Sequence, residues 1–268
     1  MFFVEDFGVH IQQPGSEFRL LIAMPVFNER KYVDRVLDKV LGYHPDLLVI
    51  DDGSNDGTAE YLASRSDIQL LQHSENRGYG QSLIAAFTYA DAHGYDWVLT
   101  MDCDEQHEPE MIPEFLRQTA MDDWDIISGS RYLEQRLDND LPPGDRRSIN
   151  YTITGMLNDL YDWQLTDAFC GFKAHRVSAM RKLHLDIPGY AFPMQFWPQA
   201  YQHGLRIKEI PVRLIYNDPT RHFGGMLDDA ENRLKHYLSV LATEHERAIA
   251  AMSDKVCAES TCSCGCPV

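Results

Sequence analysis

Short apolar runs recur through the first half of the chain, each followed by a polar turn and a helix-like segment. They do not alternate apolar with polar residues, which is typical of strands buried on both faces. The runs lie at 19–26, 47–50, 68–71, 97–100 and 125–130. Strands that alternate with helices predict an α/β fold with a doubly wound, mostly parallel sheet and right-handed crossovers. A chain of 268 residues can bury a sizeable core of this kind.

An acidic stretch directly follows the fourth run. Asp102, Asp104 and Gln106 are spaced two residues apart after the strand predicted at 97–100. In an extended chain such residues point the same way, so their oxygens could meet at the carboxyl end of a strand. These ligands suit Mg²⁺ or Mn²⁺ held together with substrate phosphates. A solvated acidic turn is the alternative interpretation.

Polar loops follow the other predicted strands as well. Asn28 is placed to cap the helix after the first strand. Asp52 follows the second strand, where it could bind a ribose or a base or could simply cap the turn. Gly78 and Gly80 follow the third and would let a ligand approach the backbone at the start of a helix over 81–93. Ligand-binding residues are therefore expected along one edge of the sheet.

The pattern changes after Arg131, where a polar, Pro-rich loop over 137–145 interrupts the alternation. The expected elements are then a helix over 148–161, a loop or short strand over 166–173, a helix over 175–183, a strand over 205–214 and a long helix over 226–252. The second half of the chain is thus predicted to be less regular than the first.

Composition excludes several classes of protein. A formal net charge of -17 argues against nucleic-acid binding, which leaves a basic footprint, and against broad adhesion to anionic lipid. No apolar run approaches the roughly 20 residues of a membrane-spanning helix. Glu5 and Asp6 stand where a signal peptide would carry positive charge. We expect a cytoplasmic protein.

The six cysteines are unevenly placed. Cys103 and Cys170 lie in the body, and the other four crowd into 257–266. This is unlike the disulfide framework of a secreted domain, so reduced thiols are expected in the body. The Cys-x-Cys-x-Cys spacing over 262–266 is not that of a zinc knuckle. We expect a disordered tail over 253–268, with metal binding or S-acylation as alternatives.

Six motifs fall in one order along the chain. They are Pro25-Val26-Phe27-Asn28-Glu29, Asp51-Asp52-Gly53-Ser54-x-Asp56-Gly57-Thr58, Asn76-Arg77-Gly78-Tyr79-Gly80, Met101-Asp102-x-Asp104-x-Gln106-His107, Gly129-Ser130-Arg131-Tyr132 and Gly171-Phe172-Lys173. One Asp-x-Asp is a weak signal, whereas six motifs in sequence are a strong one. The order resembles the family-2 glycosyltransferases with the GT-A fold, and among them the polyprenyl- or dolichyl-phosphate mannosyltransferases.

The resemblance implies a metal-dependent inverting glycosyltransferase that moves a sugar from a nucleotide-sugar donor to a polyprenyl or dolichyl phosphate. GDP-mannose is the expected donor, with UDP-glucose next, and the lipid would be met at the membrane surface. One domain would span 1–252, with a donor half over 19–130 and an acceptor half over 131–252. A hydroxyl acceptor is one alternative, and a catalytically silent binding protein with the same fold is another.

The resemblance also implies roles for residues of the donor half. Three residues would form the rim of the nucleotide pocket, namely Pro25, Val26 and Glu29. Asp52 would bind the base or ribose. The ion, Mg²⁺ or Mn²⁺, would be held against the donor diphosphate by Asp102, Asp104 and Gln106. Asp104 is expected to be catalytic, together with Arg131 of the acceptor half.

In the acceptor half, Arg131 would face the lipid phosphate. Arg147 is a second cation or else a solvated arginine, and Arg221 would replace an arginine that this group has after its penultimate strand. Gln195 occupies a position where related enzymes often have an acidic residue. A neutral amide cannot act as a base, whereas a phosphate monoester is already anionic near pH 7 and needs only arginines to position it. The glutamine therefore favours a phosphate acceptor over a hydroxyl.

Overall fold

The structure is a computed structural model that describes residues 18–217 and 222–262, with side chains as far as 254. The first half repeats strand and helix. Its elements are β1 (Leu20–Val26), α1 (Val33–Leu41), β2 (Leu47–Asp51), α2 (Thr58–Ser64), β3 (Gln69–Gln72), α3 (Tyr79–Ala92), β4 (Trp97–Thr100), η1 (Pro109–Met111), α4 (Ile112–Thr119) and β5 (Ile126–Ser130). Each of the five strands lies where an apolar run predicted one.

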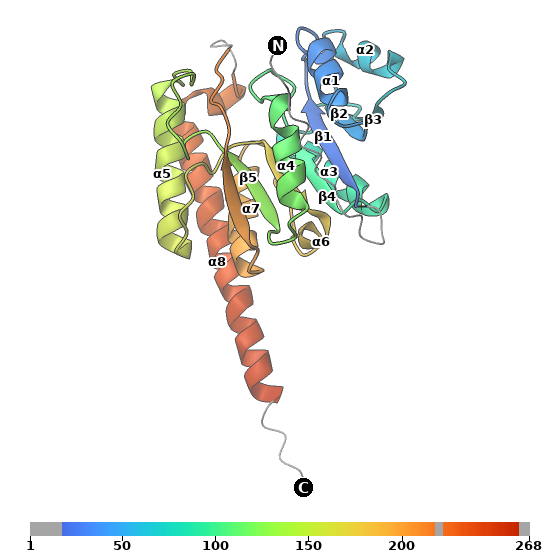
Figure 1. Ribbon diagram of the computed structural model, residues 1–268. Coiled ribbons are helices and arrows are strands. Elements are labelled where there is room, and N and C mark those ends of the chain that lie inside the picture. The colour runs from blue at the N-terminus through green and yellow to red at the C-terminus, as the bar shows by residue number, and fades with distance from the viewer. Residues whose placement is uncertain (1–17, 218–221, 263–268) are drawn as a thin grey trace, which may run out of the picture.

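The second half is less regular. Its described elements are α5 (Gly144–Tyr161), β6 (Lys173–Arg176), α6 (Val177–Met180), α7 (Phe192–Gln202), β7 (Ile207–Pro211), η2 (Gly225–Asp228) and α8 (Ala230–Cys262). The strands form one sheet in the order β3-β2-β1-β4-β6-β5-β7 (Figure 1). All neighbours are parallel except β6, which runs antiparallel to both β4 and β5. The predicted doubly wound, mostly parallel sheet is confirmed.

The sheet is covered on both faces. Leu21 and Ala23 of β1 belong to a core shared with α3, α5, α7 and α8, whereas Leu20 and Ile22 belong to a core shared with α1, α2 and α4. Neighbouring residues of β1 therefore enter opposite cores, as the pleat of a strand requires. Burying each of these Leu or Ile side chains contributes about 1.5–3 kcal/mol, which explains why the strand shows no polar alternation.

β6 corrects the helix predicted over 175–183. Ala174 pairs with Leu99 of β4 on one side and with Ile127 of β5 on the other, so the strand separates the two. Lys173 and His175 flank it and are buried. A strand that reads Lys-Ala-His-Arg carries no apolar signal, and the helix is limited to the four residues of α6.

Two further corrections concern helices. No helix was predicted for Phe192–Gln202, since α7 begins at a proline-containing turn and includes Pro198 in its interior. The disordered tail predicted from residue 253 is wrong over 253–262, because α8 continues to Cys262 and its last part extends away from the sheet (Figure 1). Residues 263–268 lie outside the described residues. None of the described helices combines the length and apolar character needed to cross a membrane.

Candidate functional site

The acidic stretch forms an irregular loop at the carboxyl end of β4. The strand ends at Thr100, and Glu105 adopts a left-handed conformation with φ of 61°. The extended geometry predicted for this stretch is therefore wrong. Asp104, only 8% exposed, instead accepts a hydrogen bond at Oδ1 from the Gln106 backbone N–H at 3.0 Å. The Asp102 side chain is 33% exposed.

A buried histidine supports this acidic loop. The Asp102 backbone N–H donates to Nδ1 of His107 at 2.9 Å, and the ring stacks on Phe172 at 5.1 Å. Burial lowers the pKa of His107 to about 4, although the nearby Asp104 carboxylate opposes this. The imidazole is therefore neutral at pH 7 and accepts the Asp102 hydrogen bond. His107 ends the Met-Asp-x-Asp-x-Gln-His motif, whose pattern predicted no role for it.

The Asp102 carboxylate lies against a glycine. A Cβ at Gly171 would stand 2.7 Å from the Tyr79 hydroxyl and 3.0 Å from Oδ2 of Asp102. Burial, followed by the charge and hydrogen bond of Asp102, raises the pKa of Tyr79 well above its usual value. The hydroxyl stays protonated and donates to the carboxylate. Gly171 in the Gly-Phe-Lys motif thus makes room for this contact.

This loop suits a divalent cation. Among the residues that the structure describes, no three His, Cys, Asp or Glu side chains converge on one point. The candidate ligands are thus two carboxylates, Asp102 and Asp104, with the Gln106 amide beside them. One or two carboxylates combined with substrate phosphates is the usual Mg²⁺ arrangement, so the residues fit such an ion. Their role as ligands stays a prediction.

The loops after β1 and β2 lie together. The Asp52 N–H donates to the Val26 carbonyl at 2.8 Å, which places one of the predicted rim residues beside Asp52. Pro25 precedes it in β1 and Glu29 lies in the loop that follows, so the rim made by Pro25, Val26 and Glu29 stays a prediction. Asn28 has φ of 57° and accepts the Asn55 N–H at 2.8 Å, so it joins these two loops. The predicted helix cap is wrong, since Tyr32 precedes α1.

The Asp52 carboxylate accepts hydrogen bonds from the protein itself. It is 4% exposed and accepts hydrogen bonds from His73 Nδ1 at 2.6 Å and from the N–H groups of Arg77 and Gly78 at 2.9 and 2.8 Å. Asp52 therefore holds the loop after β3 in place. An open pocket of about 600 Å³ lies beside it, lined in part by Asp51, Asn55 and Gln72. Nucleoside binding by Asp52 stays a prediction.

The glycines after β3 accommodate the protein itself. A Cβ at Gly78 or Gly80 would meet backbone oxygens of the 187–189 loop, and the Gln81 N–H donates to the Pro188 carbonyl at 3.0 Å. Close packing of the protein thus already requires both glycines, and the approach of a ligand at this point stays a prediction.

Gln195 fixes the same 187–189 loop. Its buried Oε1 accepts the N–H groups of Asp186 and Ile187 at 2.8 and 3.1 Å, and its Nε2 donates to the Asp186 carboxylate at 2.7 Å. The amide at the position of a potential base is thus used in a structural contact.

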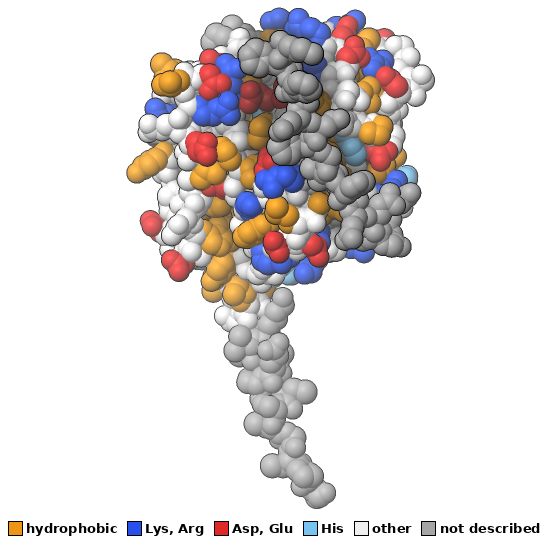
Figure 2. All heavy atoms as spheres, in the orientation of Figure 1, with side chains coloured by type: hydrophobic (Ala, Val, Ile, Leu, Met, Phe, Trp, Pro, Cys, Tyr) orange, Lys and Arg blue, Asp and Glu red, His pale blue; other side chains and the backbone are white. Residues whose placement is uncertain are grey.

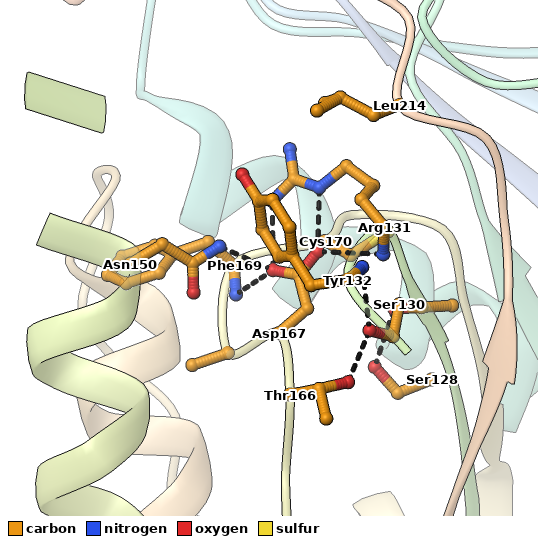
Figure 3. Close-up of polar contacts among 12 residues, drawn as sticks. Ser128, Ser130, Arg131, Tyr132, Asn150, Thr166, Asp167, Phe169, Cys170 and Leu214 are labelled. Atoms are coloured by element: carbon orange, nitrogen blue, oxygen red, sulfur yellow. Dashed lines mark hydrogen bonds and ion pairs between the residues drawn. The ribbon is translucent and has the colours of Figure 1, made fainter. Parts of the chain in front are cut away.

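Arg131 follows β5 and forms a two-pronged ion pair with Asp167 (Figure 3). Nε donates to Oδ2 at 2.7 Å and Nη2 to Oδ1 at 2.9 Å, and the Asp167 side chain has no exposed surface. Burial opposes both charges, but each group stabilises the other. The pKa of Asp167 falls to about 2 and that of Arg131 rises above its usual value. Sequence analysis did not identify Asp167, which precedes the Gly-Phe-Lys motif.

The remaining predicted cations are placed differently. Arg147 is exposed in the first turns of α5, and both it and Arg131 act on the Tyr132 hydroxyl through their charges. Arg221 lies outside the described residues. Figure 2 shows acidic and basic side chains interspersed among the described residues of the face in view.

Two of the predicted site residues, Asp104 and Arg131, lie near His107. The charges of Asp104 and Arg131 both act on this imidazole, from the loops after β4 and β5. The site thus joins an acidic loop suited to a cation with an arginine suited to an anion.

Comparisons with known proteins agree with this geometry. The family model described as glycosyl transferase family 2 matches residues 21–184. An undecaprenyl-phosphate mannosyltransferase of Micrococcus luteus is 28% identical over 224 residues, which cover 79% of this chain and 90% of that protein. A polyprenol monophosphomannose synthase of Mycolicibacterium smegmatis is 28% identical over 205 residues, which cover 72% and 76%.

Two other proteins extend the comparison. A UDP-N-acetylglucosamine–dolichyl-phosphate N-acetylglucosaminyltransferase of Methanococcus voltae is 23% identical over 218 residues, 74% of this chain and 86% of that protein. The crystal structure of glucosyl-3-phosphoglycerate synthase from Mycobacterium tuberculosis, with Mn²⁺, UDP-glucose and phosphoglyceric acid, superposes with a TM-score of 0.65 at 15% identity. This superposition covers 88% of this chain and 86% of that one. It confirms the predicted GT-A architecture.

Proposed function

Because the chain belongs to glycosyl transferase family 2 and is a glycosyltransferase, we propose that it moves a hexose from a nucleotide-sugar donor to a polyprenyl phosphate. GDP-mannose is the proposed donor, since two of the relatives are named for mannose transfer to such lipids. A UDP-sugar is the next candidate, supported by the relative named for UDP-N-acetylglucosamine.

The observation that carries the proposal is the meeting of opposite charges beside His107. The Asp102 and Asp104 loop suits a cation and the donor diphosphate, and Arg131 faces the same region from the next loop. Such a site can hold an anionic leaving group and an anionic acceptor together. A hydroxyl acceptor would instead require a base, and the Gln195 amide is taken up by the 186–187 backbone.

The proposed reaction is a single displacement. An oxygen of the acceptor phosphate forms a bond to the anomeric carbon while the bond from that carbon to the diphosphate oxygen breaks, which inverts the configuration. The nucleoside diphosphate leaves with the electron pair. Asp102, Asp104 and Gln106 would hold Mg²⁺ or Mn²⁺, and the bound ion supplies positive charge beside the departing diphosphate. Arg131 would position the acceptor, which needs no deprotonation near pH 7.

The lipid acceptor places the proposed reaction at a membrane surface. We therefore propose a protein that acts from the cytoplasmic side as a peripheral enzyme.

The test uses geranyl phosphate, a short water-soluble polyprenyl phosphate. Geraniol, which has the same chain and a hydroxyl in place of the phosphate, is the control acceptor. Purified protein is given GDP-mannose or UDP-glucose with Mn²⁺, and products are separated by mass. We expect transfer of mannose to geranyl phosphate and little transfer to geraniol. Equal transfer to both acceptors would contradict the phosphate acceptor, and preferred use of UDP-glucose would contradict the donor.

A further inference from the structure

The Arg131 side chain has a limited number of donors left for a ligand. Nε and Nη2 both donate to the Asp167 carboxylate, and the Arg131 backbone N–H donates to it as well at 3.1 Å. Within the part of the chain that the structure describes, Nη1 makes no hydrogen bond. Figure 3 shows this nitrogen turned away from Asp167, toward the side on which Leu214 lies.

Asp167 cannot adjust its position. Oδ1 also accepts from Asn150 Nδ2 at 2.7 Å and from the Phe169 N–H at 3.1 Å. The Asp167 N–H donates to Oε1 of Glu209 at 3.0 Å, so β7 holds the backbone while α5 holds the carboxylate. With no exposed surface, Asp167 itself cannot touch a substrate. Any effect it has on the reaction must pass through Arg131.

Tyr132 provides a second donor on the same side. Its ring centroid lies 5.8 Å from the Arg131 guanidinium carbon, and the charge of Arg131 acts on its hydroxyl. Figure 3 labels both side chains in this region. The hydroxyl forms no hydrogen bond among the described residues. Burial keeps the pKa of Tyr132 above its usual value, so the group is a donor at pH 7. Neither Tyr132 nor Asp167 was assigned a role from the sequence.

We infer that Asp167 is a positioning residue that presents Arg131 to the acceptor phosphate through Nη1, with the Tyr132 hydroxyl as a neighbouring donor. This inference rests on the proposed function. Asp167 uses the guanidinium edge formed by Nε and Nη2, so the phosphate meets the other side of the group, where Nη1 lies, together with the Tyr132 hydroxyl. Asp167 also compensates the charge of Arg131. Any additional positive charge that binds the acceptor phosphate would therefore come from Arg147 on α5.

The first experiment is a double-mutant cycle on Arg131→Met and Asp167→Asn, with KM measured separately for geranyl phosphate and for the sugar donor. Asp167→Asn alone should raise the acceptor KM about tenfold and leave the donor KM unchanged, because one arm of a charged fork is lost. In the Arg131→Met background it should cause no further rise. Independent effects of the two substitutions, or equal rises in both KM values, would overturn the inference.

A milder pair of variants guards against misfolding, since either single substitution above leaves a buried charge without its partner. Asn150→Ala removes one hydrogen bond to Asp167. Asn158→Ala on the same helix removes a comparable pair of hydrogen bonds to the Leu165 backbone. Both should lower thermal stability, but only Asn150→Ala should raise the acceptor KM, by about two- to fivefold. Equal KM values in the two variants would overturn the inference.

Tyr132→Phe tests the hydroxyl. The acceptor KM should rise about threefold, the effect of losing one neutral hydrogen bond, with an unchanged donor KM. Tyr151→Phe is the control, since Tyr151 is 83% exposed. Wild-type transfer to geraniol instead of geranyl phosphate would overturn the proposed function. Transfer to geranyl phosphate with an Asp167→Asn effect that persists without Arg131 would overturn only the inference.

Discussion

The proposed donor half, 19–130, and the proposed acceptor half, 131–252, each fix a buried carboxylate at the sheet edge, in different ways. Asp52 in the donor half is held mainly by backbone N–H groups of one neighbouring loop. Asp167 in the acceptor half also accepts two backbone N–H groups, but its closest partners are the Arg131 and Asn150 side chains, the first following β5 and the second on α5. In the donor half, the site thus depends on backbone N–H groups of the loops, whose positions follow from the regular repeat of strand and helix. The acceptor half builds its site from an ion-pair network.

This difference has a functional consequence. A carboxylate held by backbone groups can be replaced at the cost of local loop order, whereas a buried ion pair leaves an uncompensated charge when one partner is removed. Substitutions in the two halves should therefore separate into donor effects and acceptor effects.

Asp104→Asn should lower sugar transfer at least about 1,000-fold, because a charged group beside the departing diphosphate is lost. The fold should persist, since the asparagine Oδ1 can still accept the Gln106 N–H. Initial rates with GDP-mannose and Mn²⁺ measure the effect, and Glu105→Gln in the same loop is the matched control. Full activity of Asp104→Asn in excess EDTA would contradict a metal site here.

His175 of β6, which pairs with β4 and β5, should make stability depend on pH. Burial, and then the charge of Lys173, lower the pKa of His175 to about 3. Below the unfolded value of about 6.5 the unfolded chain binds a proton that the folded protein does not, so stability falls as pH falls. Between pH 6.5 and pH 4 the loss from this group should be about 3 kcal/mol.

Urea unfolding of wild type and His175→Leu at both pH values measures this contribution. Nδ1 of His175 has no hydrogen-bond partner within the described structure, and the ring contacts Phe87 and Phe196, so leucine should be tolerated. The variant should show a flatter pH dependence by that amount. If the stability of both proteins falls equally between pH 6.5 and pH 4, His175 is not the cause of the pH dependence.

The two halves also differed in how far sequence could predict them. Four strands of the donor half, β1, β2, β4 and β5, are almost wholly buried, and β3 is partly buried. Their apolar runs made the strand positions, and the edge carrying Asp52 and Asp102, predictable. The acceptor half departs from this rule. β6 contains the buried polar residues Lys173 and His175, and only pairing with β4 and β5 makes it a strand. The prolines of α7 concealed a helix.

Side-chain geometry within the site was harder to predict than its location. The spacing of Asp102 and Asp104 indicated the correct loop, but the left-handed Glu105 changes how the side chains are presented. Arg131 was identified, whereas its partner Asp167 lies 36 residues away and is placed by Asn150 and by contacts across the sheet. No local pattern encodes such a pair.

Asp52→Ala should weaken donor binding by about 1–3 kcal/mol, because three donors lose their acceptor and the loop after β3 is released. Calorimetry with GDP-mannose measures the affinity. Asp56→Ala is the control, since Asp56 lies in the loop after β2 and accepts hydrogen bonds from Thr58 and Arg30. Unchanged nucleotide affinity in Asp52→Ala would count against the donor role of this loop.

Gly171→Ala should raise the donor KM about tenfold, because the added Cβ would displace Asp102 or Tyr79 from their present contact. Gly171 belongs to the acceptor half but lies against Asp102 of the donor half. A rise in the donor KM would therefore show that the two halves are not independent at this contact. Gly155→Ala is the matched control, since nothing lies within 4 Å of its Cβ position and alanine favours the interior of α5. An increase confined to the acceptor KM would place Gly171 with Arg131 instead.

Arg147→Ala should have the smallest effect, a two- to fivefold rise in the acceptor KM of about 1 kcal/mol or less, since an exposed cation is well solvated. The rise should shrink at high salt, because screening over a Debye length of about 10 Å weakens an exposed charge more than a buried one. The Arg131 contribution, enclosed with Asp167, should change less with salt. Arg136→Ala, an exposed arginine paired with Asp138, is the control. If Arg147→Ala and Arg136→Ala behave alike at low salt, Arg147 is a solvated arginine and the acceptor phosphate depends on Arg131 and Tyr132 alone.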